Sequence, residues 1–351
     1  MEKRTRRLRG NEIVRKMTRE TRISSDALIY PLFIREGTGI EEEIASLKGQ
    51  IRYSPDRLAK GIEAGLQKGV RSFLLFGIPK SKDDAGTGAY SDDGVVQKAL
   101  RLMRASFGND VHLITDVCLC EYTSHGHCGL IVDRNPALPA QLPLTESDNQ
   151  ASKASSEHYS IDNDSTIQLL ARTAISHLHA GSDMVAPSAM MDKTIAALRA
   201  SMDQEGFTDS PIMSYAAKYA SSYYGPFRDA AGSAPQFGDR KTYQMDYHNG
   251  REALKRIRFD IEEGADIVIV KPALPCLDII AKAREMVTSP IAAYSVSGEY
   301  AMMQAAADLG YIDRYAVMCE SAASVFRAGA DILITYCAKE LAEAIAKGDI
   351  G

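Results

Sequence analysis

Eight short apolar segments alternate with helical patterns along almost the whole chain of 351 residues. The segments are 27–34, 72–78, 111–114, 183–187, 211–215, 266–272, 291–296 and 331–336. Between them apolar residues recur at helical spacing, as at Leu58, Ile62 and Leu66. Eight strand–helix units in one chain predict an α/β fold, a (β/α)8 TIM barrel.

A similar tripeptide stands at three of the expected junctions. Glycine, a small residue and aspartate occur at 181–183, 264–266 and 329–331, where a helix is expected to end and a strand to begin. A doubly wound sheet would usually carry a glycine-rich phosphate loop after its first strand, and the sequence has no such loop there. We therefore expect one barrel domain over 26–351, with the chemistry at the ends of its strands.

The first 22 residues differ from the rest of the chain in charge. They hold nine Lys and Arg against three Glu, although the whole chain has a net charge of −5. Such an arm could bind nucleic acid or an acidic neighbouring subunit, and the lack of interleaved aromatic residues favours the subunit. We expect an N-terminal arm, 1–25, that makes subunit contacts. We also expect an exposed insertion at 133–160, which is rich in Pro, Ser and Asn.

Nothing in the sequence indicates export or membrane insertion. No apolar run approaches the ~20 residues of a membrane span. The basic N-terminus lacks the apolar region of a secretory signal. With 45% hydrophobic and 25% charged residues, the composition is typical of a globular protein, which we expect to be cytoplasmic.

A cluster of thiols follows the third apolar segment. Three of the six cysteines lie there within eleven residues: Cys118, Cys120 and Cys128. If the strand continues in extended form, alternation places the first two thiols on one face with Asp116. Thiolates at short spacing favour Zn²⁺ over a disulfide, because nothing else suggests an oxidising compartment. Three ligands would leave a fourth position for water or substrate, whereas His125 or His127 could close the site and make it structural.

Two lysines are candidates for covalent chemistry. Lys271 closes the apolar run 267–270, so it should point into the mouth of the barrel, where desolvation favours the free amine of a Schiff-base nucleophile. The alternative is a lysine that extends its ammonium group to solvent. Lys218 follows the fifth segment by three residues and by itself would more often be a surface lysine. Because the fifth and sixth strands are neighbours, the two amines could face each other and lower a pKa.

The segment 221–244 combines aromatic residues, glycines and arginines. This mixture suits a lid that excludes water, with Arg228 and Arg240 available to clamp a carboxylate. Ser297 and Tyr336 end the last two segments and could donate hydrogen bonds to a second carboxylate. As isolated residues, all four would be structural or solvated more often than functional.

Together these segments resemble the zinc-dependent, triple-cysteine porphobilinogen synthases, also called 5-aminolevulinate dehydratases. The resemblance runs from the arm to the last predicted strand. The stretches that carry it are 116–120 (DVCLC), 125–129 (HGHCG), 218–231 (KYASSYYGPFRDAA), 237–240 (FGDR), 270–272 (VKP) and 294–299 (YSVSGE).

The resemblance implies a lyase that condenses two molecules of 5-aminolevulinate to porphobilinogen and two waters, an early step of haem and tetrapyrrole biosynthesis. It implies Schiff bases on Lys271, for the substrate that becomes the propionate side, and on Lys218, for the acetate side. The three cysteines would bind a catalytic Zn²⁺ whose open position acts as a Lewis acid on the second substrate, and Asp116 would assist proton transfers.

The same resemblance implies that Arg228 and Arg240 hold one substrate carboxylate and that Ser297 and Tyr336 hold the other. It also implies a homo-octamer whose arms wrap neighbouring barrels. Three departures from the family pattern stand out. Arg256 replaces a glutamate of an allosteric magnesium site, which makes Mg²⁺ stimulation doubtful, Lys193 replaces a glycine, and the segment after the cysteines is unusually long.

Two other interpretations explain less of the sequence. A class I aldolase barrel would account for Lys271 but would leave Lys218 and the cysteines unexplained. A zinc-stabilised module that binds nucleic acid through the basic arm would predict salt-sensitive binding of polyanions, and it would leave the eight-unit barrel without a purpose.

Overall fold

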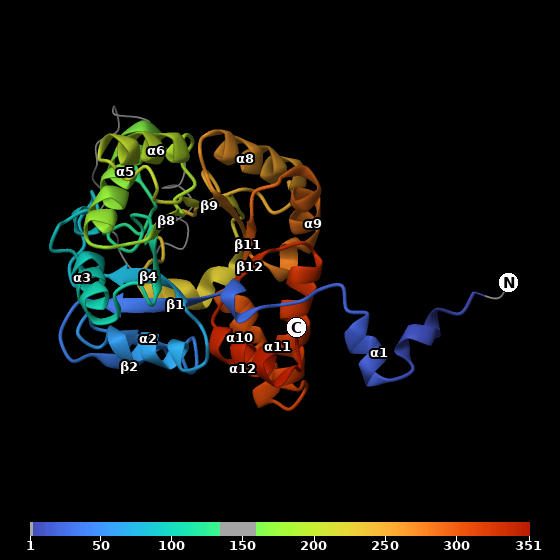
Figure 1. Ribbon diagram of the computed structural model, residues 1–351. Coiled ribbons are helices and arrows are strands. Elements are labelled where there is room, and N and C mark those ends of the chain that lie inside the picture. Colours follow the sequence, from blue (N-terminus) through green and yellow to red (C-terminus); the bar gives the residue numbers. More distant parts are fainter. Residues whose placement is uncertain (1–2, 134–158) are drawn as a thin grey trace, which may run out of the picture.

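The computed structural model describes residues 3–133 and 159–351, and eight of its strands form a nearly closed parallel barrel (Figure 1). These strands are β1 (Leu28–Arg35), β4 (Ser72–Ile78), β5 (His112–Val117), β8 (Met184–Pro187), β9 (Met213–Lys218), β10 (Ile267–Lys271), β11 (Ile291–Ser295) and β12 (Ile332–Thr335). Neighbours in the chain pair in parallel, and β12 returns to β1. An isolated bridge between Val185 and Ile212 joins β8 to β9. The predicted (β/α)8 fold is confirmed.

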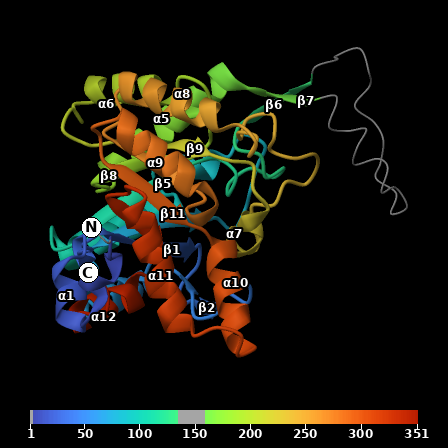
Figure 2. The same ribbon diagram turned by 90° about the vertical axis from the view of Figure 1, so that its right-hand side faces the viewer.

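Helices surround this barrel on the outside (Figures 1 and 2). They are α2 (Leu58–Leu66), α3 (Val95–Phe107), α5 (Asn163–His179), α6 (Thr194–Gln204), α8 (Gly250–Glu262), α9 (Leu277–Met286), α10 (Ser297–Asp308), α11 (Arg314–Arg327) and α12 (Ala338–Lys347). In α3 the buried residues Val96, Leu100 and Met103 lie on one helical face. In α2 a Cβ on Gly65 would come within 2.6 Å of the Phe73 ring, so glycine permits close packing of helix on strand.

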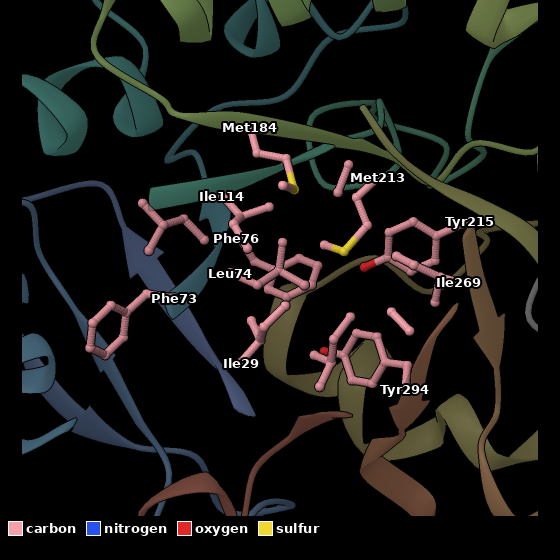
Figure 3. Close-up of a cluster of buried hydrophobic side chains, with 14 of the residues drawn as sticks. Ile29, Phe73, Leu74, Phe76, Ile114, Met184, Met213, Tyr215, Ile269 and Tyr294 are labelled. Carbon is pink, nitrogen blue, oxygen red and sulfur yellow. The ribbon is translucent and has the colours of Figure 1, made fainter. Parts of the chain in front are cut away.

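Side chains from alternate strand positions fill the barrel interior (Figure 3). Leu74 and Phe76 of β4 and Met213 and Tyr215 of β9 are each at most 2% exposed. The interior is therefore a packed core, and space for chemistry remains only where the strands end.

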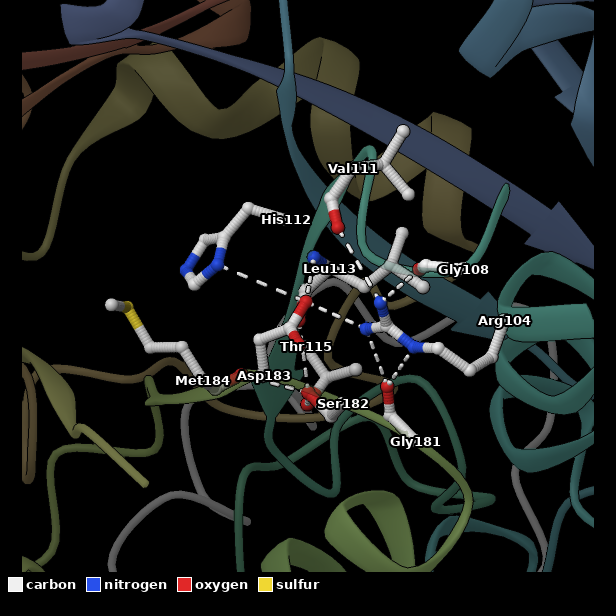
Figure 4. A network of polar contacts seen from close by, with 10 residues as sticks. All are labelled: Arg104, Gly108, Val111, His112, Leu113, Thr115, Gly181, Ser182, Asp183 and Met184. Atoms are coloured by element: carbon white, nitrogen blue, oxygen red, sulfur yellow. Dashed lines mark hydrogen bonds and ion pairs between the residues drawn. The ribbon is translucent and has the colours of Figure 1, made fainter. Parts of the chain in front are cut away.

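The Gly-Ser-Asp junction before β8 ties two strands and a helix together (Figure 4). The Asp183 carboxylate accepts a hydrogen bond from the Leu113 amide of β5 at 2.7 Å. It also pairs with Arg104 of α3 at 2.6 Å, and this guanidinium donates to the Gly181 carbonyl. The aspartate thus satisfies a backbone donor at the start of the neighbouring strand.

The other two junctions repeat this arrangement. Asp266 and Asp331 accept hydrogen bonds from the amides of Ile212 and Ile291, each at 2.8 Å. The glycines at 181, 264 and 329 have φ angles of 109°, 108° and 116°, a conformation that favours glycine. The repeated tripeptide therefore marks helix ends and strand starts, as predicted, and also links neighbouring strands.

Two antiparallel strand pairs and a short helix lie outside the eight barrel strands. β2 (Glu41–Glu43) and β3 (Ile51–Tyr53) form an antiparallel pair beside β1, and β6 (Leu130–Asp133) pairs with β7 (Tyr159–Asp162). The helix α7 (Gly225–Ala231) lies in the predicted lid. Short 3-10 helices are η1 (Thr5–Arg9), η2 (Ser25–Ala27), η3 (Thr87–Ala89), η5 (Ser222–Tyr224) and η6 (Leu274–Cys276). Most of the predicted insertion, 133–160, lies outside the described residues.

The N-terminal arm carries η1 and α1 (Glu12–Met17), and neither buries a residue. Figure 1 shows α1 standing away from the barrel. Towards the C-terminal end of the arm, Arg19 donates a hydrogen bond to the Gly351 carbonyl at 2.8 Å. Contacts of the arm with other subunits stay a prediction. Across the described parts of the chain, no helix combines the length and apolar character that a membrane crossing requires.

Candidate active site

Lys218 and Lys271 end neighbouring strands and are register partners. Contrary to the prediction, the fifth strand does not end at Tyr215, because β9 continues to Lys218. Between Ser214 and Ala217, β9 contains one residue more than β10 does over the same stretch, which is a bulge in the pairing. Strict alternation would put positions 215 and 218 on opposite faces, so the bulge turns both side chains to the interior.

Lys271 lies in an aromatic cage. Its Nζ is 4.2 Å from the ring centroid of Tyr294 and between 5.1 and 5.2 Å from those of Tyr215, Tyr224 and Phe227. The side chain is buried, and this burial, followed by the charge of Lys218, lowers the pKa of Lys271 to about 7. A large fraction of the amine is therefore uncharged at neutral pH.

Lys218 is fixed by a short chain of hydrogen bonds. Its Nζ donates to the Ser188 carbonyl at 2.5 Å, and the Ser188 hydroxyl donates to the Asp116 carboxylate at 3.1 Å. The other carboxylate oxygen of Asp116, Oδ1, is buried and has no hydrogen-bond partner among the described residues. Ser188 thus connects the second lysine to the candidate proton carrier.

A second carboxylic acid, Glu121, lies beside Asp116. Burial raises the pKa of each carboxyl to about 8, and the charge of Glu121 adds to the effect on Asp116. The Cys120 thiol donates to Glu121 at 3.2 Å. Sequence reasoning missed Glu121, although a carboxylate next to a cysteine of the cluster was the available signal.

The three cysteine sulfurs meet in one buried cluster. The Sγ atoms of Cys118, Cys120 and Cys128 lie within 4.8 Å of one another. The first two sulfurs are 3.4 Å apart, far beyond a disulfide bond of about 2.05 Å, and all three thiols are free. Sulfurs about 2.3 Å from a tetrahedral zinc would have a similar mutual spacing, so the cluster fits Zn²⁺.

The route by which the thiols converge differs from the extended strand that we expected. β5 ends at Val117, and the chain turns so that the Leu119 carbonyl accepts from the amides of Tyr122 and Thr123, both at 2.8 Å. A turn therefore brings the sulfurs together. Hydrogen bonds from Cys118 and Cys120 lower the pKa of Cys128, which favours one thiolate within the cluster.

His125 and His127 have other partners. The Nδ1 of His127 lies 3.0 Å from the Tyr243 hydroxyl, and its Nε2 lies 3.0 Å from the Phe237 carbonyl. The Nδ1 of His125 accepts from the His127 amide at 3.1 Å, and its Nε2 lies 3.3 Å from the Asp84 carbonyl. Neither ring belongs to either of the two groups of possible metal ligands found among the described residues, the three thiols and the set of Asp116, Cys118 and Glu121. This arrangement favours the open site over the closed, structural one.

The lid supplies buried donors that lack acceptors. The Nε atoms of Arg228, on α7, and Arg240 are buried and have no hydrogen-bond partner among the described residues. The side-chain amide of Gln244 also has no partner among the described residues, but this residue lines a different hollow. Arg240 also donates through one terminal nitrogen to the Gly126 carbonyl at 2.9 Å. Guanidinium groups in this state are suited to receive a carboxylate.

Ser297 and Tyr336 lie in different surroundings. Ser297 begins α10, and its hydroxyl accepts from the Phe227 amide at 3.0 Å and donates to the Tyr223 carbonyl at 3.2 Å. Tyr336 follows β12, and its hydroxyl lies 3.4 Å from that of Tyr294 in the lysine cage. Tyr336 is therefore near Lys271, whereas Ser297 contacts the lid.

One small cavity, of about 20 Å³, lies where these groups meet. Its walls contain six of the predicted residues: Asp116, Cys120, Lys218, Arg228, Arg240 and Lys271. The space is about that of one water molecule, so admission of a larger substrate requires the lid to move. A larger hollow of about 550 Å³ shares none of this cavity's residues and lacks both lysines, so we place the chemistry in the small one.

Arg256 lines that larger hollow, and its guanidinium forms ion pairs and a hydrogen bond with three neighbouring residues. It pairs with Asp192 and Asp260, both at 2.7 Å, and donates to the Met191 carbonyl at 2.6 Å. Lys193 has a left-handed backbone, with φ at 61°, where glycine would be less strained. Both departures noted in the sequence thus lie around the start of α6.

Residues 2–344 match the model of a protein family described as Delta-aminolevulinic acid dehydratase. The chain belongs to the delta-aminolevulinic acid dehydratase family. Dehydratases from Halalkalibacterium halodurans and Synechococcus elongatus are each 47% identical to it, over 97% and 98% of this chain and 96% and 98% of their own.

A solved structure of a delta-aminolevulinic acid dehydratase from Toxoplasma gondii is also similar. It contains the reaction product porphobilinogen and superposes with a TM-score of 0.89 at 40% identity, over 99% of this chain and 92% of that one. Membership of the dehydratase family argues against the aldolase and the nucleic-acid-binding interpretations, neither of which explains the paired lysines beside the thiols.

Proposed function

We propose that this protein is a porphobilinogen synthase, a hydro-lyase that condenses two molecules of 5-aminolevulinate to porphobilinogen and two waters. The observation that carries the proposal is the pairing of Lys271 and Lys218 on adjacent strands, at a cavity that also contains Cys120 and Asp116. Two amines at one site suit the joining of two ketones, because each lysine can bind one of them as an imine.

Lys271 is the better prepared nucleophile. Its uncharged amine adds to the ketone carbon of one substrate, and loss of water gives the imine. Lys218 binds the second substrate in the same way, and Asp116, which is held by the Ser188 hydroxyl and lines the same cavity, is placed to move protons there. One C–C bond and one C–N bond then form between the substrates and release both lysines. Two substrates thus give one product and two waters.

The carboxylates of the two substrates bind to different sets of side chains. The unpartnered donors of Arg228 and Arg240 bind the carboxylate of the substrate on Lys218. Tyr336 and Ser297 bind the other carboxylate. Ser297 would have to exchange its present contact with the lid for the substrate.

The thiol cluster fits Zn²⁺ held by Cys118, Cys120 and Cys128, and a bound zinc would supply Lewis-acid polarisation of a substrate oxygen. The buried carboxyls of Asp116 and Glu121, with pKa values near 8, are placed to hold or release a proton beside it. No Mg²⁺ stimulation is expected through Arg256, because its guanidinium already neutralises the nearby Asp192 and Asp260.

We also place this enzyme in the cytoplasm, as a homo-octamer joined through its arms, residues 1–25. The apolar residues of the arm support this assembly, since Leu8, Ile13 and Met17 are 58%, 79% and 67% exposed in the single chain.

The test is porphobilinogen formation by the purified protein before and after chelation. We expect activity with bound zinc, loss of activity with the chelator, and recovery when Zn²⁺ is added back. Cys120→Ser should bind less zinc, whereas Cys276→Ser, a buried thiol outside the cluster, should bind the wild-type amount. Full activity after complete zinc removal would refute the metal assignment, and no product from zinc-loaded protein would refute the proposed reaction.

A further inference from the structure

The last turn of the lid helix α7 is fastened by two cations from other parts of the barrel. Arg52 of β3 donates through Nε to the Ala230 carbonyl at 2.8 Å and through a terminal nitrogen to the Asp229 carbonyl at 3.1 Å. Lys82, in the segment after β4, donates to the Gly232 carbonyl at 2.6 Å. Three carbonyls at and just beyond the C-terminal end of this helix thus receive charged donors, and the Asp229 carbonyl also accepts from the Gly232 amide at 3.3 Å.

The other end of α7 is also held. The Ser297 hydroxyl accepts from the Phe227 amide, and the Ser46 hydroxyl donates to the Pro226 carbonyl at 3.1 Å. Gly298 lies so close that a Cβ there would be 2.5 Å from the Tyr223 carbonyl oxygen. The N-terminal end therefore rests on α10. At the C-terminal end, Arg52 and Lys82 bind the backbone carbonyls, and the Ser46 hydroxyl also donates to the Asp229 carboxylate at 2.5 Å.

A helix of seven residues has little stability of its own. Its position in the closed lid must therefore come from contacts with the barrel. Arg228 lies in this helix, one residue before Asp229, whose carbonyl Arg52 binds. Any shift of the last turn would move the guanidinium that lines the cavity.

Arg52 is itself oriented by a carboxylate. Glu42 of β2 pairs with Arg52 at 3.0 Å, and its other oxygen pairs with Arg35 of β1. The Arg52 side chain is only 15% exposed, whereas that of Arg35 is 48% exposed. The two arginines thus share one partner, but only Arg52 has hydrogen bonds to α7 among the contacts of the described residues. This difference supplies a matched control.

We propose that Arg52 and Lys82 form a latch that holds α7 in the closed lid and so positions Arg228 for the substrate carboxylate. The inference rests on the proposed function for its substrate, 5-aminolevulinate. Both are positioning residues, because they act through the backbone of α7 and line no part of the small cavity. A weaker latch raises the fraction of molecules with an open lid. The apparent affinity for substrate then falls, whereas the turnover rate of the enzyme–substrate complex changes less.

The experiment compares Arg52→Ala, Arg52→Lys and Lys82→Met with Arg35→Ala in the full-length, zinc-loaded protein. Loss of charged hydrogen bonds from Arg52 should raise the KM for 5-aminolevulinate about tenfold, with kcat within about twofold of wild type. Arg52→Lys keeps the charge but loses the forked geometry, so its KM should lie between those of wild type and Arg52→Ala. Arg35→Ala should keep the wild-type KM.

Hydrogen exchange of the peptide over 222–232 tests the latch without the reaction. We expect exchange about tenfold faster in Arg52→Ala and Lys82→Met than in Arg35→Ala, and unchanged exchange in the barrel strands. Equal KM and equal exchange in the latch variants and the control would overturn the proposal. If Arg52→Ala does not fold, Arg52→Lys and Lys82→Met decide by the same readouts. An inactive wild type would contradict the proposed function, while the exchange data would still judge the latch.

Discussion

At the scale of single residues, the proposed chemistry depends on the protonation of Lys271. Burial and the charge of Lys218 lower its pKa from 10.5 to about 7, so the amine becomes free as the pH rises through about 7. We expect the rate of imine formation to rise over that range. The readout is borohydride trapping of 4-oxopentanoate, a substrate without its amino group, followed from about pH 6 to pH 9.

Substitution of the neighbouring lysine supplies the control for this pH dependence. Lys218→Met removes a positive charge beside Lys271, so the midpoint of trapping should move to higher pH. Lys282→Met, at an exposed position of α9, should leave the midpoint unchanged. A midpoint near 10 in wild type, or one that is the same in Lys218→Met, would contradict the account.

The lowered pKa also fixes the sign of a stability effect. Because the folded protein releases the Lys271 proton more readily than the unfolded chain, unfolding takes up a proton between pH about 7 and 10.5. This group therefore destabilises the fold most below pH 7, and its penalty shrinks as the pH rises to 10.5.

Some residues of the site were predictable and others were not. Lys271 was predictable because an apolar strand leads directly to it, and the thiols because of their spacing. The burial of Lys218 was less predictable, because it depends on a bulge that no local pattern in β9 marks. The unpartnered state of the Arg228 and Arg240 guanidinium groups could not be predicted, since only the fold shows which donors lack acceptors.

At the scale of elements, Asp183 should stabilise the junction between β5 and β8. Asp183→Ala leaves the Leu113 amide without its acceptor and removes the carboxylate partner of Arg104, which keeps its bonds to backbone carbonyls, and should lower the free energy of unfolding by about 1–3 kcal/mol. Asp203→Ala removes the ion pair of the exposed Asp203 with Arg199 within α6 and should cost less than about 1 kcal/mol. Urea denaturation measures both changes. Equal losses of unfolding free energy in the two variants would contradict a special stabilising role of the Asp183 junction.

The order of the barrel elements followed from the sequence because eight apolar runs alternate with helical periodicity. The antiparallel pairs β2–β3 and β6–β7 were missed, since strands of three or four residues are too short to show a period. The lid helix α7 was missed for the same reason. Such short elements owe their conformation to contacts with the barrel, and those contacts are not visible in a local window.

At the scale of the whole molecule, the arm is the segment whose apolar side chains stay exposed to solvent in the single chain. Replacing the exposed Ile13 and Met17 together by serine should weaken assembly, because these side chains would lose apolar contacts with a neighbour. Sedimentation should show a smaller particle with an unchanged circular dichroism spectrum. Lys16→Ser, on the same helix, should keep the wild-type mass. An unchanged mass for the double variant would exclude these residues from the interface.

The central claim concerns the two facing lysines, and borohydride trapping with 5-aminolevulinate, followed by peptide mass spectrometry, tests it most directly. The account predicts a reduced adduct on Lys271 in the zinc-loaded protein, with or without a second adduct on Lys218, and no Lys271 adduct in Lys271→Ala. The absence of any adduct on either lysine in the wild-type protein would contradict imine chemistry at this site and leave the barrel fold as the part of the account that stands.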